Sequence, residues 1–242
     1  MAVSRTWLDV SYQEKDEAKA AGARWDATAR RWYAPPGREA SLERWLAGPA
    51  VPELLPGEDR TLGQGLFVDL VPASCWFTNV RSCVSPRDWE RLRRMITGRA
   101  GRRCEVCGAT QDRDVKRWLE AHERWVYDED RLVQRLGRLI CLCTDCHTVT
   151  HFGLAQIRGQ APEALLHLMN VTGMTEEQAR AHIAEAFTVW RARSERSYEL
   201  DLSILTDAGI SLAPPPAADS RPSIAADALR RAGIPPQQSG GV

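Results

Sequence analysis

Residues 104–107 read CEVC, and residues 143–151 read CTDCHTVTH, which gives two C-x-x-C pairs. Each pair forms a tight turn that presents two sulfurs to one ion, and two such turns complete the tetrahedral sulfur site that zinc prefers. The alternatives are four unrelated buried cysteines or a redox pair. Paired spacing in an intracellular chain is typical of metal binding. The sequence therefore predicts a structural zinc ion on Cys104, Cys107, Cys143 and Cys146.

The other cysteines, Cys75, Cys83 and Cys141, are not spaced as ligands, and Cys141 lies in an apolar run typical of a core. The start of the chain, MAVSRTWLDV, has no signal-peptide pattern. No apolar run approaches the roughly 20 residues that a membrane span needs. With cysteines arranged for metal rather than disulfides, these features predict a cytoplasmic protein with no membrane partner.

Three of the five histidines, His122, His147 and His151, lie between the cysteine pairs or just after the second. On a helix, His147 and His151 share one face. If residues 119–125 form a strand, Glu120 and His122 point one way and Leu119 and Ala121 the other. A strand histidine facing two helix histidines predicts a hydrolytic metal site. The alternative is that these histidines pack against the zinc turns, and we assign His167 and His182 to packing or surface.

At these residues the sequence resembles the HNH endonucleases, a family with the ββα-metal fold. The resemblance runs through Cys104-x-x-Cys107, Glu120-Ala-His122-Glu123 and Leu142-Cys143-x-x-Cys146-His147-x-x-x-His151. It covers about residues 100–153, and 66–208 with its flanks. It implies a structural zinc on the cysteines, a catalytic metal on the helix histidines, a strand histidine that activates water or binds metal, and DNA as substrate.

Two registers of this resemblance remain open. In the first, which we favour, His122 joins His147 and His151 as a ligand and Glu123 is the base that activates water. In the second, His122 is the base, and the neighbouring ligand position is held by Ala121, which cannot bind metal. The family's middle asparagine is replaced by Arg138, a residue suited to holding a phosphate, and Gln134 is the nearest amide.

Formal net charge is zero, with 32 basic and 32 acidic residues, so the global balance favours no partner. Locally, residues 79–103 hold eight arginines and only Asp88 and Glu90 as acids. Such a stretch suits a phosphate backbone, or is a solvated helix face. On the first interpretation, the helix expected over residues 86–100 grips DNA through side chains such as Arg91 and Arg94.

The pattern of elements predicts an α+β fold with a helix-rich zinc domain. We expect a small αβ module over residues 1–47, a Pro/Gly-rich linker over 48–65, the zinc domain over 66–211 and a disordered tail over 212–242. Within the zinc domain, the sequence predicts a strand over Leu66–Val71 and a helix that Ser85 and Pro86 begin. Further helices are expected over about 162–170 and from a Thr175 cap to about Ser194.

The N-terminal segment carries the pattern Trp7-Leu8-Asp9-Val10, Gly22-Ala23-Arg24-Trp25-Asp26 and Arg31-Trp32-Tyr33. It resembles a small module of unknown function found beside primase-like and other plasmid or phage DNA-handling domains. Trp25, Trp32 and Tyr33 are interpreted as the core of this module. The alternative is that they are exposed and stack on bases.

The leading hypothesis is a metal-dependent DNA endonuclease with a structural zinc and a second divalent ion, Mg²⁺, Mn²⁺, Ni²⁺ or Zn²⁺. The alternative is a non-catalytic, zinc-stabilised module that binds nucleic acid or protein. A protein-interaction adaptor is a third interpretation, and it predicts no salt-dependent affinity for DNA.

Overall fold

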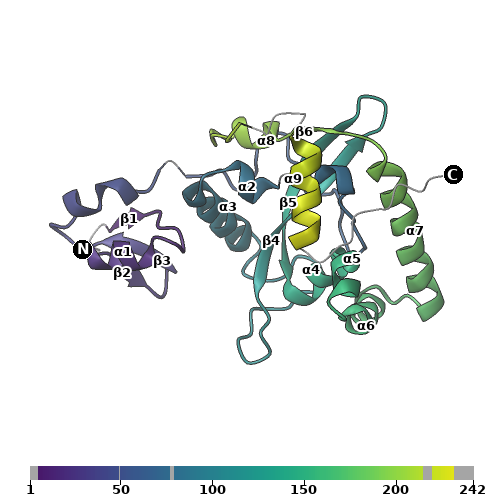
Figure 1. Cartoon of the computed structure of the whole chain (residues 1–242). Helices are drawn as coiled ribbons and strands as arrows, with labels where there is room; N and C mark the ends of the chain where they lie inside the picture. Colours follow the sequence, from purple (N-terminus) through teal and green to yellow (C-terminus); the bar gives the residue numbers. More distant parts are fainter. Residues whose placement is uncertain (1–4, 49, 77–78, 215–219, 232–242) are drawn as a thin grey trace.

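The computed structural model describes residues 5–48, 50–76, 79–214 and 220–231. The fold is mixed α+β, with two three-stranded sheets in the orders β1-β3-β2 and β4-β5-β6. The first sheet belongs to a small N-terminal lobe, and the second lies in a larger lobe that holds most of the helices (Figure 1). Each lobe has its own buried hydrophobic cluster.

Local sequence signals explain the N-terminal lobe. Its elements are β1 Thr6–Leu8, α1 Lys15–Ala20, β2 Arg24–Asp26, β3 Arg31–Ala34 and the 3-10 helix η1 Ala40–Trp45. The hydroxyl of Ser11 donates to the carboxylate of Glu14 at 2.7 Å and fixes the turn before α1. Gly22, with φ of +107°, reverses the chain after this helix. Leu8, Leu42 and Trp45 fill the core.

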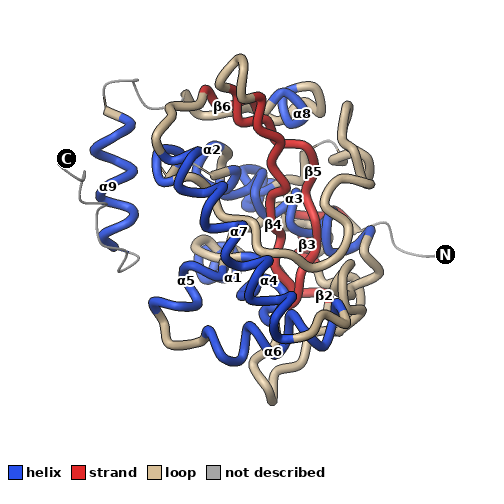
Figure 2. The backbone as a smooth tube through the Cα atoms, turned by 90° about the vertical axis from the view of Figure 1, so that its right-hand side faces the viewer, coloured by secondary structure: helices blue, strands red, loops and turns tan. Residues whose placement is uncertain are grey.

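A long β-hairpin forms the centre of the larger lobe (Figure 2). Strand β4 Leu119–Asp128 pairs antiparallel with β5 Val133–Cys143, and β6 Glu199–Asp201 adds in parallel to the start of β5. His122 lies opposite Ile140, and the register shifts between Arg124 and Trp125. The second strand is buried along almost its whole length, as a central strand covered on both faces should be.

Two long helices of the larger lobe begin at the capping residues that the sequence indicates. The hydroxyl of Ser85 accepts the Asp88 N–H at the start of α3 Pro86–Arg99, and Thr175 forms a capping box with Gln178 at the start of α7 Glu176–Ser194. The remaining helices are η2 Ala73–Cys75, α2 Val80–Cys83, α4 Thr144–Thr150, α5 Phe152–Ile157, α6 Ala161–Thr172 and α8 Ser203–Thr206. No described helix has the length and apolar character that a membrane span needs.

The strand expected over Leu66–Val71 is absent. These residues form an extended loop in which Leu66 and Val68 are buried. The loop bonds to helices rather than to a strand: the Val68 N–H donates to Nε2 of His182 at 3.0 Å, and the Asp69 N–H to the carbonyl of Thr150 at 3.0 Å. An apolar run alone therefore predicted burial here but not strand pairing.

Part of the expected linker is packed into the larger lobe. Leu55 is fully buried in its core, and the Asp59 N–H donates to the carbonyl of Gly137 on β5 at 3.0 Å. Glu58 forms a buried ion pair with Arg99 of α3 at 2.6 Å. The sequence over 48–65 predicted a connecting segment from its Pro and Gly content, which does not reveal such long-range contacts.

The tail contains a helix where disorder was predicted. Residues 221–231 form α9, and Ile224 packs against a cluster formed by Cys75 and Tyr198. Arg221 also pairs with Glu199 at 2.8 Å. Cys75 and Tyr198 lie far from Ile224 in the sequence, so the composition of the tail did not indicate this contact. The rest of the predicted tail from 232 onward lies outside the described residues.

Removing one partner of the buried Arg99–Glu58 pair should be costly. Burial raises the pKa of Glu58, but the Arg99 guanidinium and the backbone amides of Leu139 and Leu55 lower it below its ordinary value overall. Glu58→Ala leaves Arg99 buried without its carboxylate, so we expect a loss of about 3–5 kcal/mol in the free energy of unfolding. Chemical denaturation measures it.

The matched control is Arg180→Ala, which breaks the exposed Arg180–Glu176 pair with the same N···O distance of 2.6 Å. It should cost no more than about 1 kcal/mol. Equal losses for both variants would contradict the structural role assigned to Glu58.

Candidate metal centres

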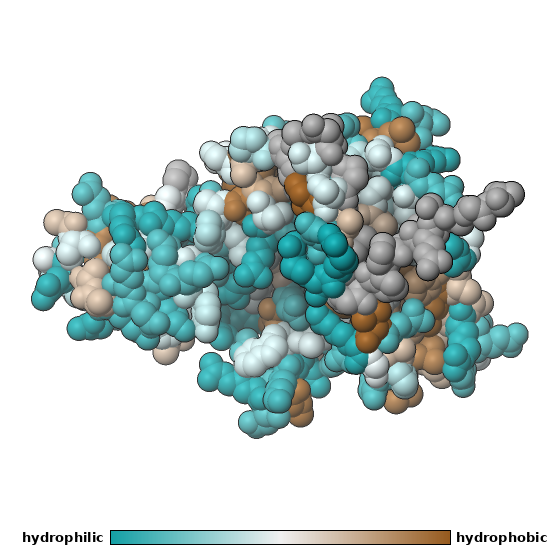
Figure 3. All heavy atoms as spheres, in the orientation of Figure 1, coloured by the Kyte–Doolittle hydropathy of each residue, from teal (hydrophilic) through white to brown (hydrophobic). Residues whose placement is uncertain are grey.

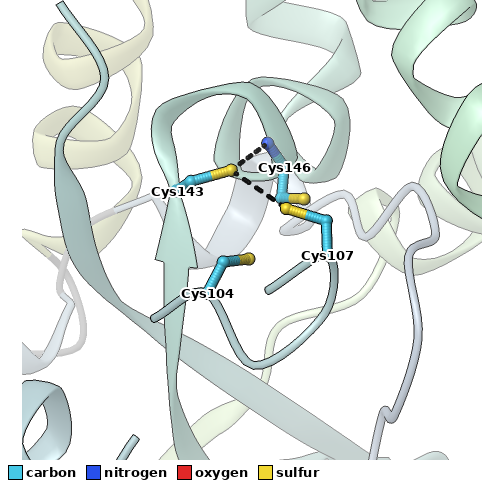
Figure 4. Close-up of side chains that lie close together, drawn as sticks. All are labelled: Cys104, Cys107, Cys143 and Cys146. Atoms are coloured by element: carbon cyan, nitrogen blue, oxygen red, sulfur yellow. Dashed lines mark hydrogen bonds between the residues drawn. The ribbon is translucent and has the colours of Figure 1, made fainter. Parts of the chain in front are cut away.

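Four cysteine sulfurs meet at one point (Figure 4). The sulfurs of Cys104, Cys107, Cys143 and Cys146 all lie within 4.8 Å of one another, and those of Cys107 and Cys143 are 3.6 Å apart. A tetrahedral zinc with Zn–S bonds of about 2.3 Å requires sulfurs about 3.8 Å apart. The cluster can therefore hold a structural metal such as zinc, as the spacing predicted.

Two different turns position these sulfurs. In the first, the Gly108 N–H donates to the carbonyl of Cys104 at 3.0 Å, and Gly108 has φ of +74°, a conformation that favours glycine. In the second, Cys143 ends β5 and is also the N-cap of α4, where its sulfur accepts the Cys146 N–H at 3.5 Å. The cluster thus joins a loop to the point where the hairpin passes into a helix.

The thiols need a cation to ionise together. The hydrogen bond that the Cys143 thiol donates to the Cys104 sulfur raises the pKa of Cys143 to about 12, and Cys104 and Cys143 together raise the pKa of Cys146. Among these three cysteines the thiolate is favoured on Cys104, because the hydrogen bonds from Cys143 and Cys146 lower its pKa. A bound cation reverses this balance, because it deprotonates coordinating thiols.

The sequence did not predict that His167 contacts the cysteine cluster. Its Nε2 lies 3.2 Å from the sulfur of Cys146, although it was assigned to packing or surface. A ring N–H here donates to the sulfur and helps to orient it. His167 lies in α6, 21 residues beyond Cys146, so no local spacing signalled this contact.

A second cluster lies against the hairpin and consists of His122, His147 and His151. The ring centroids are 4.6–5.1 Å apart, and one ligand nitrogen from each ring lies within 4.8 Å of the others. Around one ion with bonds of about 2.1 Å, these nitrogens would be about 3.4 Å apart. The nitrogens of the three rings are therefore at most about 1.4 Å farther apart than they would be around one tetrahedral ion. His122 comes from β4, His147 from α4, and His151 from the junction of α4 and α5.

The electrostatics of this cluster favour neutral imidazoles. Burial lowers the pKa of His122 well below its ordinary value, and His151 and His147 lower it further. Burial, followed by the charge of His147, lowers the pKa of His151 to about 3. Burial also lowers the pKa of His147 although Glu120 opposes the shift. Because a neutral imidazole keeps a lone pair, these groups are ready to act as ligands.

Two charged side chains adjoin the histidines. The Glu120 carboxylate lies 3.4 Å from Nδ1 of His147, which leaves Nε2 for a ligand. Arg124 lies two residues beyond His122 and so shares its face of β4. Its guanidinium lies 4.2 Å from the Phe67 ring centroid and 3.6 Å from the Asp69 carboxylate. Among the described residues, its three buried nitrogens have no hydrogen-bond partner.

Glu123, the candidate base, does not join the histidines. Strand alternation places it on the opposite face of β4, where its carboxylate accepts the Val80 N–H at 3.2 Å. Burial raises its pKa. The first register therefore keeps its three imidazoles but loses its expected base.

Arg138 does not project towards a ligand. Its side chain is 3% exposed, and it donates to the carbonyl of Arg60 and to the Glu105 carboxylate, both at 2.6 Å. The prediction that Arg138 holds a phosphate is therefore wrong, because its guanidinium group anchors the loop around residue 60 instead. Arg91 and Arg94 instead face the N-terminal lobe, where both approach Asp9.

Comparisons with known proteins concern the N-terminal lobe. Residues 5–47 match the family model described as a domain of unknown function, DUF5710. Two curated proteins named DNA primase TraC, from Escherichia coli, are 45% identical over 53 residues and 50% identical over 46 residues. These matches cover 22% and 19% of this chain but only 4% of each relative. No solved structure matches the chain.

The N-terminal part therefore resembles a primase-associated module, as its sequence pattern predicted. The resemblance of the larger lobe to HNH endonucleases rests on its own residues, and it stays a hypothesis.

The cysteine cluster predicts a simple metal-content experiment. Cys143→Ser should remove the zinc and lower the melting temperature by about 10 °C or more, because binding at a structural zinc site contributes to folding. Metal analysis and thermal unfolding of the purified chain measure both effects.

The matched control is Cys141→Ala, because Cys141 is also buried on β5 but lies outside the cluster. It should retain one zinc per chain. Zinc retained in full by Cys143→Ser would contradict the assignment of the ligands.

Proposed function

We propose that the larger lobe is a metal-dependent DNA endonuclease whose second divalent ion is held by His122, His147 and His151. The observation that carries the proposal is the convergence of three neutral imidazoles from one strand and the following helix. A hairpin followed by a helix, β4-β5-α4, is also the order of elements that the HNH resemblance implies. The DNA context of the N-terminal matches supports DNA as the substrate.

A divalent ion at this site would lower the pKa of a bound water and neutralise charge on a phosphodiester. Each protein group has a separate task. The imidazoles hold the ion, and Glu120 orients His147 through Nδ1. Arg124 adds positive charge on the same face of β4, where its buried nitrogens lack hydrogen-bond partners among the described residues and its ion-pair partner Asp69 lies 3.6 Å away. His147 and Glu120 are partly exposed, so the site opens to solvent on their side.

The alternative function is a non-catalytic zinc module. The position of Glu123 on the far face of β4 favours it, because no carboxylate base then lies where the first register expects one. Metal stoichiometry separates the two. The nuclease proposal expects two ions per chain, and the alternative expects one zinc with no second ion while all three histidines are intact.

The direct test is plasmid nicking by the purified full chain with added Mg²⁺, Mn²⁺, Ni²⁺ or Zn²⁺. We expect nicking with at least one of these ions. His147→Ala should lower the rate at least about 100-fold and lose the second ion, because removal of one of three ligands opens the site, while the cysteine-bound zinc remains.

His182→Gln is the matched histidine control, since its amide oxygen can still accept the Val68 N–H that Nε2 of His182 now accepts. It should keep both ions and the nicking rate. The proposal would be refuted if no ion supports nicking, or if His147→Ala and His182→Gln lose nicking activity equally.

Glu123→Gln distinguishes the two interpretations of the strand. The amide oxygen can accept the Val80 N–H as the carboxylate does, and the side chain lies away from the histidines. We therefore expect the nicking rate to stay within about twofold of the wild type. A loss comparable with that of His147→Ala would restore Glu123 as the base and require the strand to rearrange when it binds metal.

A further inference from the structure

A cleft of about 450 Å³ lies between the N-terminal lobe and α3, and none of its lining residues belongs to either metal cluster. Its walls come from the β2–β3 turn, the segment around Gly48 and Val51, and one face of α3. Hydrophilic residues dominate the face of the molecule where the two lobes meet (Figure 3). The charged side chains that line this cleft are almost all arginines.

The cleft has an excess of positive charge. Seven arginines line it, with Asp9 and Glu53 as the only acids among its lining residues. Asp88, Glu90 and Glu58 lie outside the lining but pair with Arg91, Arg93 and Arg99. Counting these three acids as well, seven arginines face five carboxylates. Two positive charges therefore remain after every such pair is counted.

The excess is carried by exposed groups. Arg30 in the β2–β3 turn and Arg102 just after α3 are both exposed, and neither forms an ion pair with another described residue. Both have positive φ, of 50° and 58°, so each sits at a sharp reversal of the chain. A long cationic side chain at such a turn is free to reach an anion in the cleft.

The deeper part of the cleft is also short of negative charge. Among the described residues, Asp9 is the only carboxylate that pairs with Arg31 and Arg94, and Arg91 is shared between Asp9 and Asp88. The guanidinium groups of Arg31 and Arg91 each lie 3.6 Å from Asp9. Burial, followed by the charge of Arg94, lowers the pKa of Arg31. The Nε atom of Arg31 is buried without a hydrogen-bond partner among the described residues. An anion entering the cleft would relieve this repulsion between guanidinium groups.

An aromatic ring borders the arginines. Trp25 lines the cleft and is 49% exposed, with its ring edge-on to Trp32 at 5.4 Å. The core interpretation of Trp25 is therefore wrong, because Leu8, Leu42 and Trp45 form the core of this lobe instead. Proteins that bind single-stranded nucleic acid typically use basic side chains on its phosphate backbone and exposed aromatic rings that stack on its bases.

We propose that this arginine-lined cleft binds a single strand of nucleic acid, with Arg30 and Arg102 on its phosphates and Trp25 stacked on a base. Both lobes contribute residues, so neither lobe alone forms the site. The proposal does not depend on the histidine cluster, since no residue is common to the two. A phosphodiester strand fits better than a small anion, because the arginines extend along the cleft from a turn of one lobe to the end of α3.

The test is fluorescence anisotropy of the zinc-loaded full chain with labelled dT12, rU12 and a 12-base-pair duplex, without added divalent ion. Arg30→Ala/Arg102→Ala should weaken binding of both single strands roughly tenfold, and the slope of log affinity against log salt should fall by about 1.4, as two lost phosphate contacts require. Trp25→Ala should weaken single-strand binding roughly tenfold and affect duplex binding less.

Arg113→Ala/Arg180→Ala is the charge-matched control, because both residues are exposed and lie outside the cleft. It should bind both strands as the wild type does. Equal losses in the two double variants, no effect of Trp25→Ala, or tighter binding of duplex than of either strand would overturn the proposal. Of dT12 and rU12, the tighter ligand identifies whether DNA or RNA is preferred.

His147→Ala separates this site from the proposed nuclease. It should bind dT12 as tightly as the wild type does, even where it abolishes nicking. Loss of strand binding in this variant would mean that the histidine cluster, not the cleft, holds the strand.

Discussion

The meeting of four cysteine sulfurs is the constraint on which the arrangement of the larger lobe depends. The loop that carries Cys104 and Cys107 has no strand or helix of its own, and Cys143 belongs to both β5 and α4. The neighbouring sulfurs raise the pKa values of Cys143 and Cys146, so these thiols stay protonated unless a cation is present. An ion bound there would therefore fix both the loop and the direction in which α4 leaves the hairpin. His147 directly follows Cys146, so the same centre would set the position of the first helix histidine.

Burial gives the histidine cluster its chemical character. Three imidazoles lie edge to edge in a largely dry site, where the charged form of each is disfavoured by desolvation and by its neighbours. Nδ1 of His147 has the Glu120 carboxylate 3.4 Å away, whereas Nδ1 of His122 is buried without a hydrogen-bond partner among the described residues. Buried polar atoms are rarely left in this state. A shared ion would satisfy several of them together, which supports a ligand rather than a purely packing role.

The sequence predicted those features that depend on short spacing. The cysteine pairs, the i, i+4 histidines and the caps at Ser85 and Thr175 each specify geometry within a few residues, and the structure has them. Features set by distant contacts were not predictable in this way. The partners of Arg138, Arg60 and Glu105, lie 78 and 33 residues away, so the sequence did not show that its guanidinium is already engaged. A phosphate was therefore predicted as its partner. The helix α9 likewise depends on Cys75 and Tyr198, and alternation alone could have shown that Glu123 turns away from His122.

Asp9 explains how two positively charged surfaces stay together. Its side chain is almost fully buried, accepts the Gly48 N–H at 3.0 Å and contacts Arg31 of its own lobe and Arg91 and Arg94 of α3. Even with Asp88, which pairs with Arg91, two carboxylates do not neutralise three guanidinium groups. Asp9 therefore holds the lobes in contact while the cleft stays positive. A second link, from Arg87 to Glu14 at 3.0 Å, lies at the start of α3. Burial acts to raise the pKa of Glu14, but Arg87 and Ser11 lower it to about 2. These contacts make α3 common to both lobes. The arginine-rich stretch is thus neither a fully solvated face nor a free DNA-gripping helix, because residues of the N-terminal lobe line the cleft together with α3.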